Sequence, residues 1–377
     1  MKACIFNIGT WHDHTEPTNV LVKLWKACKC RQLGVIENQS GKNTGKEPLD
    51  FIKQYEGNLQ DSSKNDGYKW INDGANGVGS GMLPQTDVNV ELLQLLSTKA
   101  GLSEVVIVGH SRGAVLSVRI AAWLFEKLPL VNCHLFLYDP VKRMVRGTDR
   151  DNREIHDNVQ SIRVIAMEDQ IQSDFKLLTI KKRTKGTSGR ADINSSDYTR
   201  LPGTHGTATQ VTGHPIGKVG YMLALRWLKG LSITVAADVG TNDSDLLKAY
   251  CEIPRQNGVT LSGGTMWRKV NDNGKSSGYK TVKVGGERTA LLDRKAGKNR
   301  FMGTSLFVNE EHCTLFSKFY PLLGKMIVEQ EYPDSPAAQL SYQSRLMSAK
   351  PELLSLKGKD VDTYTWLRRA FPQLPEV

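Results

Sequence analysis

A serine flanked by two glycines is the feature of this sequence that most clearly points to chemistry. The segment Val105 to Ala114 reads V-V-I-V-G-H-S-R-G-A and contains the pattern G-x-S-x-G around Ser111. An apolar run precedes the pattern and a helix-like stretch follows it, which is the strand, turn and helix context of a nucleophile elbow. In such a turn the helix N-terminus directs backbone N–H groups at a developing oxyanion. The segment therefore predicts that Ser111 is a nucleophile for acyl transfer.

A serine hydroxyl is a weak nucleophile, so a histidine base and an orienting carboxylate must be brought to it. The chain order of serine, acid and histidine places the acid after Ser111. Asp139 follows the apolar run His134 to Tyr138 and is expected one βα step along the sheet. Glu168 and Asp169 end the next expected strand and are the alternative acids. A turn-capping role is the other interpretation of Asp139.

Three histidines are candidates for the base. His205 lies in the Pro- and Gly-containing loop Leu201 to Thr207, and loops of this kind often carry function on a rigid scaffold. His214 and His312 compete with it, and a loop histidine is often no more than a solvated side chain. His205 is the preferred base, with His312 as the alternate.

The elements that must position these residues alternate between short β-rich runs and helical patterns. This alternation predicts a mostly parallel sheet flanked by helices, the α/β class. Strands are expected at Ala3–Phe6, Gly34–Ile36, Val105–Val108, His134–Tyr138 and Ser161–Ala166, and helices at Val20–Ala27, Val88–Leu96, Ala114–Lys127 and Tyr221–Leu228. The segments 30–44 and 55–81 are rich in Gly, Asn, Asp and Ser and are expected to be mainly loops.

Beyond about residue 235 the pattern changes. The sequence predicts a core over residues 1–235 and an α+β extension or second domain over 236–377, for which it suggests no role. Two β-like runs and two helical stretches are expected there, at Tyr279–Val284, Thr304–Val308, Thr314–Glu329 and Leu340–Met347.

The chain is strongly basic. Its 377 residues include 50 Lys and Arg against 39 Asp and Glu, a formal charge of +11, which favours anionic partners. The segments Lys176–Arg190 and Arg268–Arg300 carry much of this excess. They are interpreted either as solvated loops or as a surface for anionic phospholipid headgroups. Nucleic acid is not expected, because no basic motif interleaved with aromatic residues is present.

The six cysteines contain no CxxC pair and are expected to be reduced thiols in hydrophobic positions. Cys28-Lys29-Cys30 is the closest pair, and no metal or organic cofactor is expected. No run of 18 apolar residues predicts a membrane span, and the apolar stretch after Met1 is too short for a Sec signal peptide.

Several motifs follow one another as in an α/β-hydrolase family that includes type VI secretion phospholipase effectors and uncharacterised bacterial relatives. Residues 7–12 and Thr18-Asn19-Val20 resemble its D-G-T-W-N and T-N-V motifs, residues 73–81 its G-V-G-T-G segment, residues 109–114 its G-F-S-R-G-A elbow, residues 201–205 its P-G-x-H motif, and residues 223–228 its L-R-W helix. The resemblance covers about residues 1–230. Ile8 replaces the family's first Asp, and Gly206 to Thr209 stand where the family has D-V-G-G-G.

The resemblance implies an α/β-hydrolase fold and a serine lipase, phospholipase or esterase in which Ser111 attacks an ester carbonyl and His205 relays the proton. It leaves the choice among Asp139, Glu168 and Asp169 open. Backbone donors at Gly9 or Thr10 and at Arg112 are expected to form the oxyanion hole.

The resemblance further implies a bacterial effector that is made in the cytoplasm and exported by a specialised secretion system. A secretion-system or host partner and peripheral contact with an anionic membrane are expected. The alternative is a non-catalytic hydrolase-fold module that binds an anionic surface or a host protein.

Overall fold

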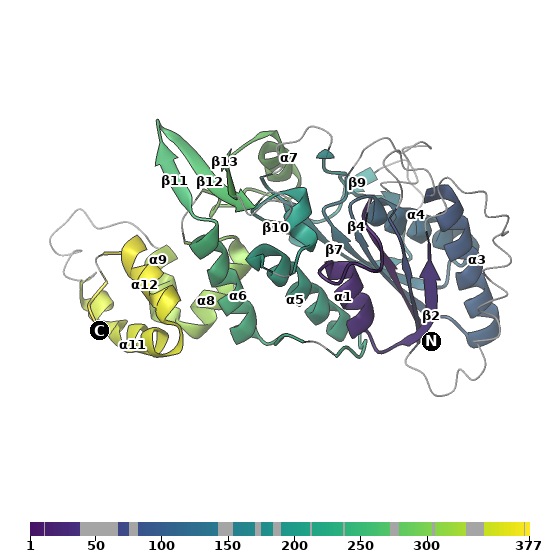
Figure 1. The fold of residues 1–377 in the computed structure, drawn as a ribbon, viewed down its shortest axis with the longest axis horizontal. Coiled ribbons are helices and arrows are strands. Elements are labelled where there is room, and N and C mark those ends of the chain that lie inside the picture. Colours follow the sequence, from purple (N-terminus) through teal and green to yellow (C-terminus); the bar gives the residue numbers. More distant parts are fainter. Residues whose placement is uncertain are drawn as a thin grey trace.

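A seven-stranded sheet forms the centre of the molecule (Figure 1). The computed structural model describes residues 1–10, 12–37, 67–74, 82–141, 154–169, 175–183, 190–211, 213–236, 238–271, 279–303, 306–328, 343–372 and 374–377. The strands are β1 (Lys2–Asn7), β2 (Arg31–Ile36), β3 (Tyr68–Asn72), β4 (Glu104–His110), β5 (Asn132–Tyr138), β7 (Val159–Met167) and β10 (Tyr198–Leu201), in the order β10-β7-β5-β4-β1-β3-β2. Every neighbouring pair is parallel. The expected α/β class is confirmed, and the architecture fits an α/β-hydrolase-like fold.

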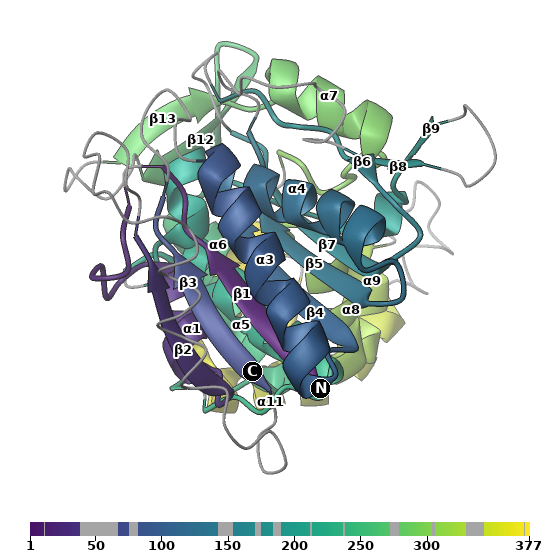
Figure 2. The same cartoon turned by 90° about the vertical axis from the view of Figure 1, so that its right-hand side faces the viewer.

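Helices cover both faces of this sheet (Figure 2). One face contacts α3 (Met82–Ala100) and α4 (Arg112–Lys127), and the other contacts α1 (Val20–Ala27) and α5 (Pro215–Gly230). Because successive side chains of a strand point to opposite faces, Ile5 packs in the α3 and α4 layer while Phe6 packs in the α1 and α5 layer. Both side chains are fully buried. This double covering explains why the central strands are continuous apolar runs.

The strand β3 corrects one sequence-based expectation. It lies within residues 55–81, which were expected to be mainly loop because they are rich in Gly, Asn, Asp and Ser. The strand contains the polar residues Lys69 and Asn72. Both polar side chains are buried within the fold, where Lys69 Nζ donates to Trp25 O and Asn72 Nδ2 donates to Asn7 Oδ1. Internal hydrogen bonds thus allow a strand that composition does not reveal.

The chain beyond α5 adds helices and a small antiparallel sheet. These elements are α6 (Asp243–Gln256), β11 (Val259–Ser262), β12 (Thr265–Asn271), β13 (Tyr279–Lys283), α7 (Glu287–Lys295), α8 (Glu310–Phe319), α9 (Pro321–Val328), α11 (Lys350–Lys359) and α12 (Val361–Ala370). A further three-stranded sheet joins β6 (Glu154–Ile155), β8 (Lys181–Arg183) and β9 (Arg190–Asp192). Among the described residues, no helix has the length and apolar character that a bilayer crossing requires.

Two expectations for this region need correction. Residues 306–308, the described part of the expected strand Thr304–Val308, form no strand but bury their apolar side chains in the core. The helix expected over 314–329 is two helices, because Pro321 has no N–H to continue the α8 ladder and begins α9 instead. Residues 343–348 are helical, and the rest of the expected helix at Leu340–Met347 lies outside the described residues.

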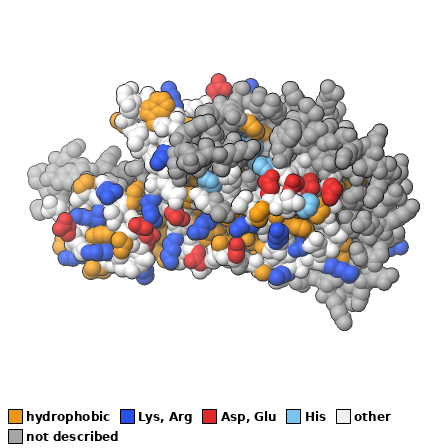
Figure 3. All heavy atoms as spheres, in the orientation of Figure 1, with side chains coloured by type: hydrophobic (Ala, Val, Ile, Leu, Met, Phe, Trp, Pro, Cys, Tyr) orange, Lys and Arg blue, Asp and Glu red, His pale blue; other side chains and the backbone are white. Residues whose placement is uncertain are grey.

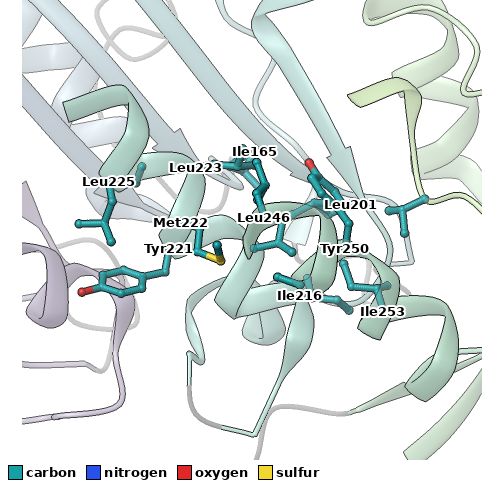
Figure 4. Packing of buried hydrophobic residues seen from close by; sticks show 14 of the residues in the cluster. Ile165, Leu201, Ile216, Tyr221, Met222, Leu223, Leu225, Leu246, Tyr250 and Ile253 are labelled. Atoms are coloured by element: carbon teal, nitrogen blue, oxygen red, sulfur yellow. The ribbon is translucent and has the colours of Figure 1, made fainter. Parts of the chain in front are cut away.

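One hydrophobic cluster connects the sheet with the chain beyond residue 235. Ile165 of β7 and Leu201 of β10 belong to the same cluster as Met222 of α5 and Leu246 and Tyr250 of α6 (Figure 4). All five side chains are at most 1% exposed. The sheet face therefore shares its core with α6, while the domain boundary expected after residue 235 stays a prediction.

Candidate active site

Ser111 lies in a tight turn between β4 and α4. Its backbone has φ 57° and ψ −122°, a conformation that residues with a side chain rarely adopt. The turn depends on close approach of the backbone: a Cβ atom at Gly113 would lie 2.2 Å from Asn7 O, and one at Gly109 would lie 2.6 Å from Gly113 O. The strand, turn and helix expected around Ser111 are therefore present, with glycines where side chains would clash.

His205 and Asp139 lie next to Ser111 in one continuous chain of hydrogen bonds. His205 Nε2 is 2.8 Å from Ser111 Oγ, and His205 Nδ1 is 2.6 Å from Asp139 Oδ2. An ionised carboxylate can only accept, so the imidazole proton belongs on Nδ1 and leaves Nε2 to accept from the serine hydroxyl. All three residues are buried, with at most 7% of each exposed. The arrangement can move a proton from Ser111 to an imidazole that a carboxylate orients.

Asp139 is held in place from three sides. It follows β5 with a positive φ of 44°, and its Oδ1 accepts a hydrogen bond of 3.0 Å from Met167 N. The Arg288 guanidinium of α7 also pairs with Oδ1. Burial alone would raise the pKa of Asp139, but Arg288 and His205 outweigh burial and lower it. Asp139 is thus anionic at neutral pH, as an orienting acid requires.

The alternative acids Glu168 and Asp169 are also buried, but their described hydrogen bonds do not lead to His205. Arg200 Nε donates to Glu168 at 2.8 Å, and Arg268 donates to Asp169 at 2.9 Å. Asp169 also accepts from Gly203 N at 2.7 Å, two residues before His205. These carboxylates therefore anchor the histidine loop and the β12 strand, whereas Asp139 contacts the imidazole itself.

The alternate base His312 lies in a different part of the core. Its Nδ1 accepts from Val308 N at 3.3 Å, and its Nε2 lies 3.4 Å from Cys251 Sγ. Burial lowers the pKa of His312 to about 3. His214, the other competitor, is the residue before α5, and its pKa is lowered by partial burial. The structure joins neither ring to Ser111.

Aromatic rings enclose His205. The His110 ring stacks on it with centroids 4.7 Å apart, and the Phe175 ring lies at the same distance on a tilted plane. Burial, followed by the neighbouring His205, lowers the pKa of His110 well below its usual value, so His110 is a neutral ring beside the base. The two rings thus pack against the imidazole of His205.

The three residues expected to form the oxyanion hole lie around the same turn. A Cβ atom at Gly9 would lie 3.1 Å from Ser111 Cβ, so the loop after β1 passes close to Ser111. Thr10 Oγ1 is buried and has no hydrogen-bond partner among the residues that the structure describes. Arg112 follows Ser111 as the first residue of α4. Gly9, Thr10 and Arg112 are therefore near Ser111, and their role in oxyanion binding stays a prediction.

Two buried arginines are site residues that the sequence did not reveal. Arg268 and Arg288 fall in the basic segment Arg268–Arg300, which was interpreted as solvated or as facing lipid headgroups. They are only 5% and 7% exposed and pair with Asp169 and Asp139. The interpretation is wrong for these two residues. Linear sequence cannot separate a buried arginine from a solvated one, because only the fold brings its carboxylate partner to it.

Among the described residues, a group of side chains suited to a metal lies away from Ser111. Cys4, Cys28 and Cys30 have their Sγ atoms within 4.8 Å of one another, next to the helix α1. The expected reduced and buried state of the cysteines holds for these three, while their convergence from separate elements was not foreseen.

The comparisons with known proteins leave the family of this chain open. No family model matches the chain, and no curated protein matches it either. One similar solved structure is that of a Lactobacillus plantarum WCFS1 protein described, by inference, as a cell surface hydrolase. The similarity covers 54% of this chain and 93% of that protein's chain. The identity is 12% and the TM-score 0.30. This likeness is remote, so the function is inferred from the site.

Proposed function

We propose that this chain is a serine-dependent carboxylic ester hydrolase that works through an acyl-serine intermediate. The observation that carries the proposal is the continuous chain from Ser111 Oγ through His205 to Asp139, with contacts of 2.8 and 2.6 Å. The strained turn at Ser111 supports it, because such strain is kept where the surrounding structure requires it, often at active sites.

In the proposed mechanism, Ser111 Oγ attacks the ester carbonyl carbon while His205 Nε2 takes the hydroxyl proton. Asp139 remains ionised and stabilises the imidazolium. His205 then returns the proton to the leaving alcohol, which leaves an acyl group on Ser111. A water molecule, deprotonated by the same Nε2, then attacks the acyl carbon, and Nε2 returns that proton to Ser111 Oγ as the acid leaves. Backbone N–H groups of Gly9 or Thr10 and of Arg112 stabilise the tetrahedral oxyanion in both steps.

We propose a lipid ester, with a phospholipid as the leading case, as the substrate class. The sequence resemblance supports this choice. So does the β11–β12 hairpin, which extends away from the helices around it (Figure 1). Leu261 and Met266 pair across the hairpin and are 73% and 40% exposed. Exposed apolar side chains of this kind can enter a lipid interface. The sequence resemblance alone supports the further proposals of a secreted effector, a specialised export route and a secretion-system or host partner.

The catalytic proposal is tested by comparing the wild type with Ser111→Ala on short-chain esters and phospholipid vesicles. We expect Ser111→Ala to lose at least about 10³-fold in kcat, and Ser348→Ala, an exposed serine of the C-terminal part, to keep full activity. A fluorophosphonate probe should label Ser111 alone. Equal inactivity of the wild type and Ser111→Ala would favour the non-catalytic module, and labelling of another residue would reject the assignment.

The acid is tested by a matched pair of substitutions. Asp139→Asn should lower kcat by about 10⁴-fold, because it removes the anion and favours the wrong imidazole tautomer. Asp169→Asn changes a neighbouring buried carboxylate that does not contact His205, so the fall in kcat should be far smaller than for Asp139→Asn. Equal losses in the two variants, with both correctly folded, would contradict the choice of Asp139.

A further inference from the structure

Three cysteines from two segments of the chain lie close together in the core. Cys4 lies in β1, Cys28 follows α1, and Cys30 precedes β2, and each is at most 4% exposed. The Sγ atoms of Cys4 and Cys30 are 3.8 Å apart, and all three sulfurs lie within 4.8 Å of one another. A tetrahedral ion with metal–sulfur bonds of about 2.3 Å holds its sulfurs about 3.8 Å apart. The spacing thus suits three ligands of one ion, whereas a disulfide would need the sulfurs to close to about 2.0 Å.

The backbone around the cluster is fixed by hydrogen bonds. Cys28 N donates to Leu24 O, Lys29 N donates to Thr234 O, and Arg31 N donates to Gly67 O, each at 2.9 Å. These bonds hold the loop between α1 and β2 from three sides, and β1 is an internal strand of the sheet. The positions of the thiols are therefore set before any ion binds.

A buried ammonium next to the cluster is the second, independent observation. Lys69 lies opposite Cys4 in the β1–β3 register and is 7% exposed. Its Nζ donates to the carbonyl oxygens of Trp25 and Cys28, and no salt bridge joins it to a carboxylate within the described part of the chain. A buried cation is costly unless an anion compensates it.

We propose that Cys4, Cys28 and Cys30 form a buried trithiolate site for a soft divalent cation of the zinc class, with the Lys69 ammonium as its compensating charge. Thiolates select soft and borderline cations over Mg²⁺ or Ca²⁺. Three thiolates, one divalent ion and one ammonium together carry no net charge, which makes the assembly compatible with the apolar core. The site would join α1, β1 and β2, and it is independent of the chemistry at Ser111.

The proton balance of the site follows from its ligands. A cysteine binds a metal ion as its thiolate, so each thiol that is protonated before binding gives its proton to solvent as its metal–sulfur bond forms. Binding is therefore expected to release protons and to weaken as pH falls.

The test is a titration of the reduced, chelator-treated full chain with Cd²⁺, followed by the ultraviolet thiolate-to-metal charge-transfer band. We expect saturation at one ion per chain, with release of protons, and displacement of previously bound Zn²⁺ by Cd²⁺. Cys30→Ser should weaken binding by at least about 100-fold, and Lys69→Met by about tenfold. Cys133→Ser is the matched control, because Cys133 is also a fully buried strand cysteine but faces the opposite side of the sheet.

X-ray absorption on the Zn²⁺-loaded wild type gives a second measurement that needs no variant. Three sulfur neighbours at about 2.3 Å are expected. Wild-type affinity in Cys30→Ser, a shell of oxygen and nitrogen, or no binding at all would overturn the proposal. Formation of a Cys4–Cys30 disulfide in a chain that binds no Cd²⁺ would show that the cluster is an oxidation site instead.

Discussion

At the scale of single residues, backbone strain gathers at the candidate site. Among the described residues only Ser111, Asp139 and Ser232 combine a side chain with a positive φ. Two of the three therefore lie at the carboxyl ends of adjacent strands and in the same hydrogen-bond chain. Conformations of this kind cost about 1–3 kcal/mol each and persist where neighbouring structure over-determines them. The strain at Asp139 is offset by Met167 and Arg288, which fix its carboxylate.

His312 shows how a buried histidine differs from a catalytic one, and it allows a prediction on pH. Its folded pKa of about 3 lies below the value of about 6.5 in an unfolded chain. The stability that neutral His312 provides is therefore complete above about pH 6.5 and is lost as pH falls toward 3. Between pH 7 and 5.5 this loss is about 1 kcal/mol.

The prediction is tested with His312→Gln, which keeps an acceptor for Val308 N. Urea unfolding at pH 7 and 5.5 should show a smaller drop in the free energy of unfolding for the variant, by about 1 kcal/mol. Ester hydrolysis should remain close to wild type, whereas His205→Gln should lose it. A loss of hydrolysis in a folded His312→Gln would show that the base was assigned wrongly.

At the scale of elements, α7 connects the part of the chain beyond residue 235 with the candidate site. Arg288 pairs with Asp139 and donates to Phe175 O at 3.1 Å, and Phe175 lies against the His205 ring. Thr289 of the same helix contacts Glu168 O at 3.4 Å. One helix thus contacts both Asp139 and the residue whose ring packs on His205, so in the proposed reaction we expect Arg288 to act as a positioning residue.

Replacing Arg288 should change the pH profile as well as the rate. Arg288→Met leaves the buried Asp139 without its cation, so the pKa of Asp139 rises. The acid limb of the pH profile of kcat should therefore move to higher pH. We expect kcat to fall by about 10- to 100-fold and the free energy of unfolding by about 3 kcal/mol. The measurements are the pH dependence of kcat and urea unfolding.

The controls separate charge from packing. Arg288→Lys should restore part of the activity and return the acid limb toward wild type, because the positive charge remains. Arg294→Met changes an exposed arginine of the same helix and should have little effect. An unshifted acid limb in a folded Arg288→Met would show that Arg288 has a merely structural role.

At the scale of the whole molecule, the two parts of the chain share their interior. The cluster under the sheet includes side chains of α1, α5, α6, α8 and the C-terminal helices. The basic side chains do not form a separate patch on the face in Figure 3. The described Lys and Arg side chains there lie among Asp and Glu over the helices of the C-terminal part. The chain beyond residue 235 contains ion pairs such as Lys318 with Asp243 and Arg255 with Asp362.

We expect residues 1–235 alone not to fold into an active protein. Removing the rest exposes the α5 surface that packs on α6 and leaves Asp139 and Asp169 without Arg288 and Arg268. Soluble yield, circular dichroism on heating and ester hydrolysis would be compared with the full chain. A truncated chain that melts cooperatively and hydrolyses esters would contradict this expectation and support two independent domains.

The sequence by itself determined the local features of this protein. The apolar runs predicted five strands of the main sheet, and α1 has the bounds that its pattern predicted. The glycines around Ser111 predicted the turn, because their type and spacing are visible in the sequence. The candidates Ser111, Asp139 and His205 were chosen for the same reason: each follows or precedes a recognisable element.

Only the tertiary structure decided which distant residues meet. It placed Asp139 rather than Glu168 or Asp169 against His205, and it brought Arg288 and Lys69 to their buried partners. A side chain's partner is set by which strands are neighbours and which helix crosses them, and these contacts span up to 149 residues of chain. Residue type and spacing carry no record of such contacts, because burial and pairing are properties of the folded chain.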